Sequence, residues 1–150
     1  MKKLVIYSSV HHGNTEKVAK AMAQALKAEV IKAESVDVKT IQDYDLIGFG
    51  SGIYGGKVHK SMLKLIENLP EMQNKRVFVF STSGVGKKDY NNDTAEKLSA
   101  KGCTVAGSFA CRGYDTFGPF KLIGGIAKGR PNDEDILNAK NFVLKFIEYA

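Results

Sequence analysis

The chain has 150 residues, of which 43% are hydrophobic and 25% charged, and its net charge is +6. This size suits one domain with a buried core, so we expect a single domain over residues 1–150. No apolar run is long enough to cross a bilayer, and the basic charge favours acidic partners or simply keeps the protein soluble.

Five short runs rich in Val, Ile, Leu and Phe predict buried strands. Their hydrophobicity is continuous rather than alternating, which is typical of strands covered on both faces. The first run follows Lys2-Lys3, and its apolar part of about four residues is too short for a secretory leader, so we expect a cytoplasmic protein. The five runs are residues 3–8, 29–33, 45–51, 76–82 and 104–110.

Helical patterns lie between these strands. The last helix has the strongest start, because Asn132 and three acids precede its apolar stripe. Residues 35–44 predict only a weak helix, and Gly102 closes a short one. The apolar stripes are Val18, Met22 and Leu26; Val58, Met62, Leu65, Ile66 and Leu69; Ala95 and Leu98; and Ile136, Ala139, Val143, Phe146 and Ile147.

The alternation of strands and helices predicts an α/β fold with a parallel sheet, right-handed crossovers and helices on both faces. Ligands of such sheets bind beyond the carboxyl ends of the strands. Four turns lie there, at residues 8–15, 51–57, 82–90 and 111–131.

The two cysteines are expected to be free thiols. Cys103 and Cys111 stand at opposite ends of the predicted strand 104–110. At a rise of about 3.3 Å per residue they would lie roughly 26 Å apart, which is beyond disulfide reach. Free thiols fit a reducing compartment.

The first turn predicts an anion site at the start of a helix. The free backbone N–H groups and the helix dipole favour an anion there, and Gly13 allows close approach. Ser8, Ser9, Asn14 and Thr15 add neutral donors. Capping of the helix by Asn14 or Thr15 alone is the alternative, and the two roles are compatible.

His11 and His12 raise the question of a metal. Adjacent loop histidines project in different directions, and no Cys, Asp or Glu accompanies them at ligand spacing, so we expect no metal site. No Lys or Arg lies in residues 4–16. A bound anion would therefore be held by neutral groups.

The second turn matches a dinucleotide fingerprint only by chance. Residues 50–55 read Gly-Ser-Gly-Ile-Tyr-Gly, but the strand over residues 76–82 ends without the acid that would bind the ribose. The glycines instead indicate a flexible loop that carries Tyr54. The third turn offers hydroxyls, backbone amides and Tyr90, so the three turns together suit a phosphate group and a flat ring.

Other catalytic schemes find no support in the sequence. There is no Gly-x-Ser-x-Gly elbow, no Walker motif and no Cys-x-x-Cys pair. The first strand also lacks the acidic cluster that a magnesium-dependent phosphoacceptor needs. We expect no catalytic side chain.

These residues resemble the flavodoxin family, and the resemblance covers essentially the whole chain. It implies a three-layer, flavodoxin-like sandwich with a five-stranded parallel sheet in order 2-1-3-4-5, and noncovalent FMN as the cofactor. The motifs that carry it are Ser8-Ser9 followed by Gly13-Asn14-Thr15-Glu16-Lys17, the loop Gly50-Ser51-Gly52-Ile53-Tyr54-Gly55, and Ser81-Thr82-Ser83-Gly84.

The resemblance also implies which residues bind FMN. The phosphate would rest on Ser9 and residues 12–15, with the choice between Ser8 and Ser9 left open, and the flavin ring would lie between loops 51–56 and 83–90. The full expected set is Ser8, Ser9, His12, Gly13, Asn14, Thr15, Ser51, Gly52, Ile53, Tyr54, Gly55, Gly56, Thr82, Ser83, Gly84, Val85, Gly86 and Tyr90.

Two departures from the family pattern bear on function. The insert at residues 10–12 lengthens the first turn, and the chain is basic where typical flavodoxins are acidic. The loop with Lys57, His59 and Lys60 is more distantly similar to menaquinone-dependent protoporphyrinogen oxidases, which carry an insertion near the last strand. Here residues 112–131 form a long connection, suited to docking a partner or an anionic apolar substrate, or to packing over the sheet edge.

We therefore expect an FMN-binding electron-transfer protein that exchanges electrons with a redox protein partner, one with an acidic docking surface being favoured by charge. We expect no nucleic acid partner. The first alternative is an FMN-dependent oxidoreductase acting on a quinone or porphyrin-like molecule. The second is a partner-binding module without a cofactor.

Overall fold

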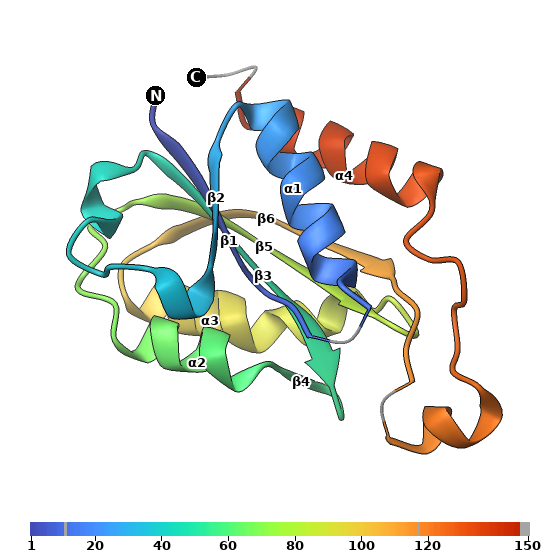
Figure 1. Ribbon diagram of the computed structural model, residues 1–150. Coiled ribbons are helices and arrows are strands. Elements are labelled where there is room, and N and C mark those ends of the chain that lie inside the picture. The colour runs from blue at the N-terminus through green and yellow to red at the C-terminus, as the bar shows by residue number, and fades with distance from the viewer. Residues whose placement is uncertain (11, 117, 148–150) are drawn as a thin grey trace.

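A twisted parallel sheet crosses the molecule between two layers of helices (Figure 1). The computed structural model describes residues 1–10, 12–116 and 118–147. Its long strands are β1 (Lys3–Ser8), β2 (Glu29–Lys32), β3 (Leu46–Tyr54), β5 (Arg76–Ser83) and β6 (Thr104–Arg112).

All neighbouring long strands are parallel, and their order is β2-β1-β3-β5-β6. This confirms the predicted order 2-1-3-4-5, counted over the long strands. The short strand β4 (Lys57–Val58) pairs antiparallel with the end of β3 and lies off this path.

The helices α1 (Asn14–Leu26) and α4 (Asp133–Leu144) cover one face of the sheet, while α2 (Lys60–Glu67) and α3 (Asn92–Ala100) cover the other (Figure 1). Short 3-10 turns complete the fold: η1 (Ala33–Ser35), η2 (Ile41–Asp43), η3 (Lys88–Asn91) and η4 (Gly118–Ile123). Among the described residues, no helix has the length and apolarity needed to cross a bilayer.

Each face of the sheet buries an apolar cluster. Val18 and Met22 of α1 pack with Phe78 of β5 and Val143 of α4, whereas Met62 and Leu98 belong to the opposite cluster. On β3, Gly48 and Gly50 stand opposite Phe78 and Phe80, and a Cβ at either glycine would overlap the phenyl ring. Gly50 is thus required by core packing, which explains its place in the chance fingerprint.

Two helix predictions were wrong in detail. Residues 35–44 form 3-10 turns separated by a loop, in which Asp37 accepts hydrogen bonds from the Lys39 N–H and the Thr40 hydroxyl. Such local side-chain and backbone bonds compete with an α-helix. Val58 lies in β4 rather than in α2, because it pairs with Ile53 across a tight turn.

The cysteines agree with the prediction. Cys103 and Cys111 are buried free thiols; Cys103 directly precedes β6 and Cys111 lies near its end. Burial raises the pKa of Cys103 to about 11 and that of Cys111 to about 12. Neither side chain is therefore ionised to any useful extent near neutral pH.

Candidate functional site

The turns at the carboxyl ends of the strands converge at the lower right of Figure 1, where the connection 112–131 also projects. A cavity of about 230 Å³ opens between them. It is lined by Ile53, Gly55, Gly56, Ser83, Gly84, Val85, Tyr90, Asp115 and Phe120. Residues of loops 51–56 and 83–90 thus line one cavity, and the connection supplies two wall residues that the sequence did not identify.

The start of α1 has a glycine as its N-cap residue. Gly13 caps the helix with φ 64°, a left-handed conformation, and a Cβ built on it would meet no described atom within 4 Å. A glycine has no side chain with which to cap the N–H groups of Asn14 and Thr15, and among the described residues no hydrogen bond from either N–H is found. Ser9 Oγ accepts the Glu16 N–H at 3.3 Å.

The two candidate serines have different environments. Ser8 is buried, and its Oγ lies 2.6 Å from Ser61 Oγ of α2. Ser9 is half-buried and bonded to the first turn of α1. The geometry therefore favours Ser9 over Ser8 as a contact for an anion at this helix start.

Hydroxyl contacts join the separate turns to one another. Thr15 Oγ1 lies 2.8 Å from Thr82 Oγ1, and both side chains are buried. Tyr54 Oη accepts the Val10 N–H at 3.1 Å and donates to the Val10 carbonyl at 3.2 Å. Burial raises the pKa of Tyr54, so its hydroxyl stays neutral and donates.

Other predicted residues of the second turn support the loop. Ser51 is buried; its Oγ donates to the Gly52 carbonyl and accepts the His59 N–H. His59 caps α2 by accepting the Ser61 N–H, and its ring meets Tyr54 edge-on at a centroid distance of 5.5 Å. Ser51 therefore holds the loop with its hydroxyl rather than pointing it into the cavity.

The connection 112–131 packs against the first turn. Asn14 Nδ2 donates to the Tyr114 carbonyl at 2.8 Å, and His12 Nε2 lies 3.1 Å from Thr116 Oγ1. The His12 and Tyr114 rings are 4.4 Å apart. His12 thus contacts the connection, while His11 lies outside the described residues; within residues 1–10, 12–116 and 118–147 no group of three His, Cys, Asp or Glu could hold a metal.

The same connection also holds the third turn. Arg112 Nε donates to the Gly84 carbonyl at 2.8 Å, and the Gly113 N–H donates to the Ser83 carbonyl at 2.9 Å. A Cβ on Gly84 would overlap Ile126. Ser83 Oγ accepts the Gly86 N–H at 2.7 Å. The connection therefore fixes both the first and the third turn.

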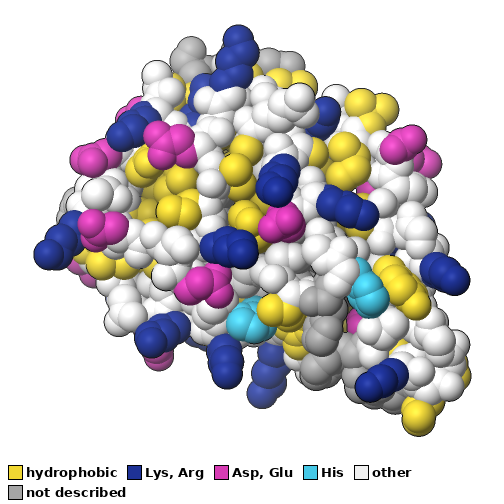
Figure 2. Space-filling model, in the orientation of Figure 1, with side chains coloured by type: hydrophobic (Ala, Val, Ile, Leu, Met, Phe, Trp, Pro, Cys, Tyr) yellow, Lys and Arg dark blue, Asp and Glu magenta, His cyan; other side chains and the backbone are white. Residues whose placement is uncertain are grey.

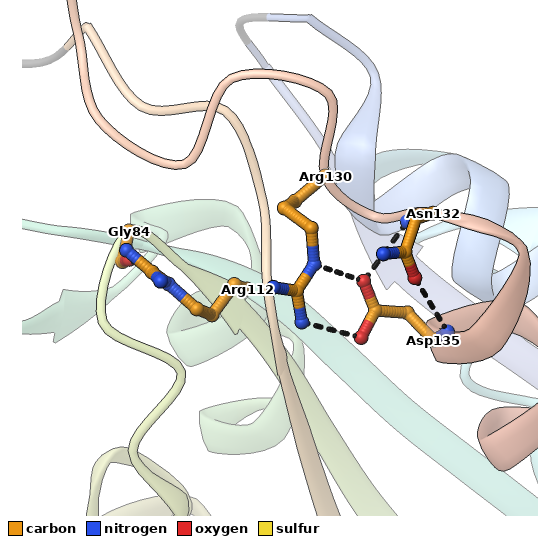
Figure 3. A network of polar contacts seen from close by, with 5 residues as sticks. All are labelled: Gly84, Arg112, Arg130, Asn132 and Asp135. Atoms are coloured by element: carbon orange, nitrogen blue, oxygen red, sulfur yellow. Dashed lines mark hydrogen bonds and ion pairs between the residues drawn. The ribbon is translucent and has the colours of Figure 1, made fainter.

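A partly buried ion pair anchors the end of the connection on α4 (Figure 3). Arg130 donates from Nε and Nη2 to the two carboxylate oxygens of Asp135, at 2.5 and 2.7 Å. Asp135 and Asn132 also form a reciprocal capping box at the helix start. Arg130 lowers the pKa of Asp135, which is only 6% exposed.

Comparison with known proteins decides the family. Residues 4–118 match the family model described as a flavodoxin domain. The chain belongs to the flavodoxin family. A protein of uncharacterised function from Methanocaldococcus jannaschii is 45% identical to this chain over 150 residues, which is 99% of each chain.

Solved structures agree in fold. A flavodoxin from the domain Archaea matches with a TM-score of 0.76 at 22% identity, covering 99% of this chain and 98% of that one. The oxidised flavodoxin 2 from Bacillus cereus gives 0.73 at 23% identity, with both chains fully covered. At this level of identity the likeness concerns the fold.

FMN is the cofactor of the flavodoxin family, and the site fits it. The helix start with its glycine cap suits a phosphate, and the cavity lies between two loops that carry tyrosines. The family and fold also support an electron-transfer role of the FMN type.

Proposed function

We propose that Ser9 and residues 12–15 hold the phosphate of FMN and that loops 51–56 and 83–90 hold its ring. The observation that supports this best is the start of α1, where the N-cap residue Gly13 makes no side-chain hydrogen bond and Ser9 accepts the Glu16 N–H. Among residues 4–16 there is no Lys or Arg, so N–H groups and hydroxyls would bind the phosphate.

The ring contacts follow from the cavity lining. Tyr90 and Val85 offer an apolar wall on one side, and Ile53 with the glycines 55 and 56 offers the other. Tyr54 lies at the edge of the same loop, tied to Val10 by its hydroxyl. Gly56 has φ 80° and open space at its Cβ position, so this loop can approach a flat ring closely.

The proposed role is to pass electrons to or from a redox protein partner. The flavin supplies the electron-transfer chemistry, and the protein supplies position and electrostatics. Such a role requires no acidic or basic side chain, in agreement with the absence of a catalytic motif in the sequence. The net charge of +6 favours a partner with an acidic docking surface.

FMN content tests the proposal directly. The purified protein should be yellow and hold one FMN per chain, and the apoprotein should quench FMN fluorescence on rebinding. A colourless protein that takes up no FMN would reject the proposal and leave a cofactor-free binding module as the remaining function.

A second candidate function rests on Asp115 and Phe120, which the connection contributes to the cavity. A wall with an aromatic ring could contact a quinone or a porphyrin-like molecule, making the protein an FMN-dependent oxidoreductase. Saturable quinone reduction faster than with free FMN, and reduced in Phe120→Ser, would support this function. Turnover no faster than with free FMN would exclude it.

A further inference from the structure

Exposed apolar side chains gather on the loops at the end of the sheet where the cavity opens. Of the seven large hydrophobic residues exposed among the described ones, four lie on the loops at the carboxyl ends of the strands. Val10 and Val85 are 43% and 48% exposed, and Leu122 and Ile123 at the tip of the connection are 88% and 72% exposed. Two adjacent aliphatic side chains with this much exposure are typical of an interaction surface.

The tip is held in place by hydrogen bonds rather than hanging loose. Asp115 and Ile126 pair as an antiparallel bridge, with N–H to carbonyl distances of 2.9 and 2.8 Å. The Gly125 N–H donates to the Phe120 carbonyl, and Tyr114 Oη donates to the Gly124 carbonyl. Phe120 lines the cavity, and the apolar tip, Leu122 with Ile123, follows it two residues later in the same 3-10 turn η4.

Seven cationic side chains stand on these loops or on the strand and helix ends next to them, and we call them the basic rim. All seven are exposed, and none takes part in the ion pairs found within the described parts of the chain. Asp89 and Asp115 are the acids of these loops. The basic rim comprises Lys57, Lys60, Lys87, Lys88, Arg112, Lys121 and Lys128.

Figure 2 shows the lobe formed by the connection at the lower right, with hydrophobic and basic side chains together on it. Further basic side chains follow the lower edge of the molecule. This combination of an apolar centre with charges around it is the pattern of a protein docking surface.

The charges and the shape of this surface disfavour a second copy of the chain, a nucleic acid or a membrane as its partner. A second copy docked through the same surface would bring two basic rims together, which like-charge repulsion opposes. Leu122 and Ile123 offer no ring on which a nucleic acid base could stack. An anionic membrane would need one insertable element, whereas the exposed apolar residues lie on three separate loops around the mouth.

We propose that the apolar tip and the basic rim dock an acidic redox protein whose own face combines carboxylates with an apolar patch. This inference rests on the proposed electron-transfer function, because the surface borders the mouth of the FMN cavity. The rim would steer the encounter, and the tip would hold the complex by burying Leu122 and Ile123.

The test is an NMR titration of the FMN-loaded, ¹⁵N-labelled protein with a strongly acidic plant-type ferredoxin. At low ionic strength, amide signals of residues 57–60, 85–88 and 121–124 should shift. Salt at about 0.3 M should weaken the complex by screening the rim. Shifts centred on α4, or no shifts at any salt concentration, would overturn the proposal.

Matched variants separate the tip from the rim. Leu122→Ser with Ile123→Ser should raise the Kd by about fivefold or more, whereas Leu137→Ser, which removes a leucine 56% exposed on α4, should leave it unchanged. Lys121→Glu with Lys128→Glu should weaken binding by about tenfold at low salt. Lys27→Glu with Lys145→Glu gives the same net charge at the far ends of α1 and α4 and should change binding much less.

Two further measurements distinguish other occupants. Sedimentation with phosphatidylserine vesicles that is lost in the tip variant would assign the surface to membranes and overturn the proposal. So would a concentration-dependent dimer that the tip variant abolishes. FMN content is measured in every variant and in the wild type. A wild-type protein that holds FMN but does not bind ferredoxin would contradict the docking proposal and leave the proposed function intact. A wild-type protein without FMN would contradict the proposed function itself.

Discussion

The two helices on one face of the sheet, α1 and α4, begin in opposite ways. At α4, Asn132 and Asp135 satisfy each other's backbone N–H groups, and Arg130 neutralises the carboxylate. At α1, Gly13 provides no side chain, no described atom lies within 4 Å of its Cβ position, and Ser9 accepts the Glu16 N–H. One helix start is closed by its own sequence, whereas the other is open to a ligand.

Two helix N-termini on the same face of the sheet therefore have different roles: that of α4 is structural, and that of α1 is proposed to bind FMN. The closed start of α4 holds the connection against the body, and the connection in turn reaches back to Asn14 and Gly84. The open start of α1 therefore depends on the closed one for its surroundings. Changes at the two starts should have different consequences, the first for FMN binding and the second for stability.

The largest effect is expected from Gly13→Asp. A carboxylate at this position would face the FMN phosphate, and the repulsion should weaken FMN binding by roughly 100-fold or more. Gly13→Asn imposes a similar backbone cost without charge, because asparagine also tolerates positive φ. It should bind FMN more tightly than Gly13→Asp in a fluorescence titration; equal affinities for the two variants would show that no phosphate lies there.

Breaking the closed start should cost stability instead. Arg130→Met leaves the Asp135 carboxylate buried without its partner, and we expect the free energy of unfolding to fall by about 3 kcal/mol. Urea unfolding measures this change. Lys97→Met removes an exposed ion pair with Asp93 on α3 and should cost about 0.5 kcal/mol or less. Similar losses in both variants would contradict the role given to the pair of Arg130 with the buried Asp135.

The stability contribution of Asp135 should depend on pH. Its pKa is lowered below the ordinary value of 3.8, mainly by Arg130, so its carboxylate favours the folded state above about pH 4. As the pH falls through the lowered pKa, that contribution is lost. The stability difference between wild type and Asp135→Asn, measured by urea unfolding, should therefore be constant near neutral pH and shrink below about pH 4. A difference that grows on acidification would contradict a lowered pKa of Asp135 in the folded state.

A smaller effect on stability and FMN affinity is expected at the contact between the start of α1 and the connection 112–131. Asn14→Ala removes the hydrogen bond to the Tyr114 carbonyl and should lower the free energy of unfolding by about 1 kcal/mol. FMN affinity should fall severalfold, since the first turn loses one support. Lys140→Ala, which removes a 3.3 Å bond to Gln24 between α1 and α4, serves as control and should leave FMN affinity unchanged.

The sequence predicted what depends on local patterns. Val18, Met22 and Leu26 are all buried in one cluster, and the capping of α4 by Asn132 follows from residues only three apart. The strand order came from the family resemblance together with the alternation of elements. Hydrophobic periodicity and capping are short-range signals, so one sequence carries them.

The remaining features depend on contacts between distant residues. The apolar stripe places Val58 in a helix, because its strand pairing with Ile53 is a tertiary contact that helical periodicity does not reveal. The choice between Ser8 and Ser9 rests on Ser61, which lies 53 positions from Ser8. Asp115 and Phe120 reach the cavity only because the connection folds back on itself. The length of that connection was the one signal that pointed to it.

The most direct measurement follows backbone amide signals by NMR while FMN is added to the apoprotein. The account predicts large shifts at Gly13, Asn14 and Thr15, where the open helix start meets the phosphate, and little change at residues 133–135 of the closed start. Tight FMN binding that leaves residues 13–15 unshifted would contradict the central claim.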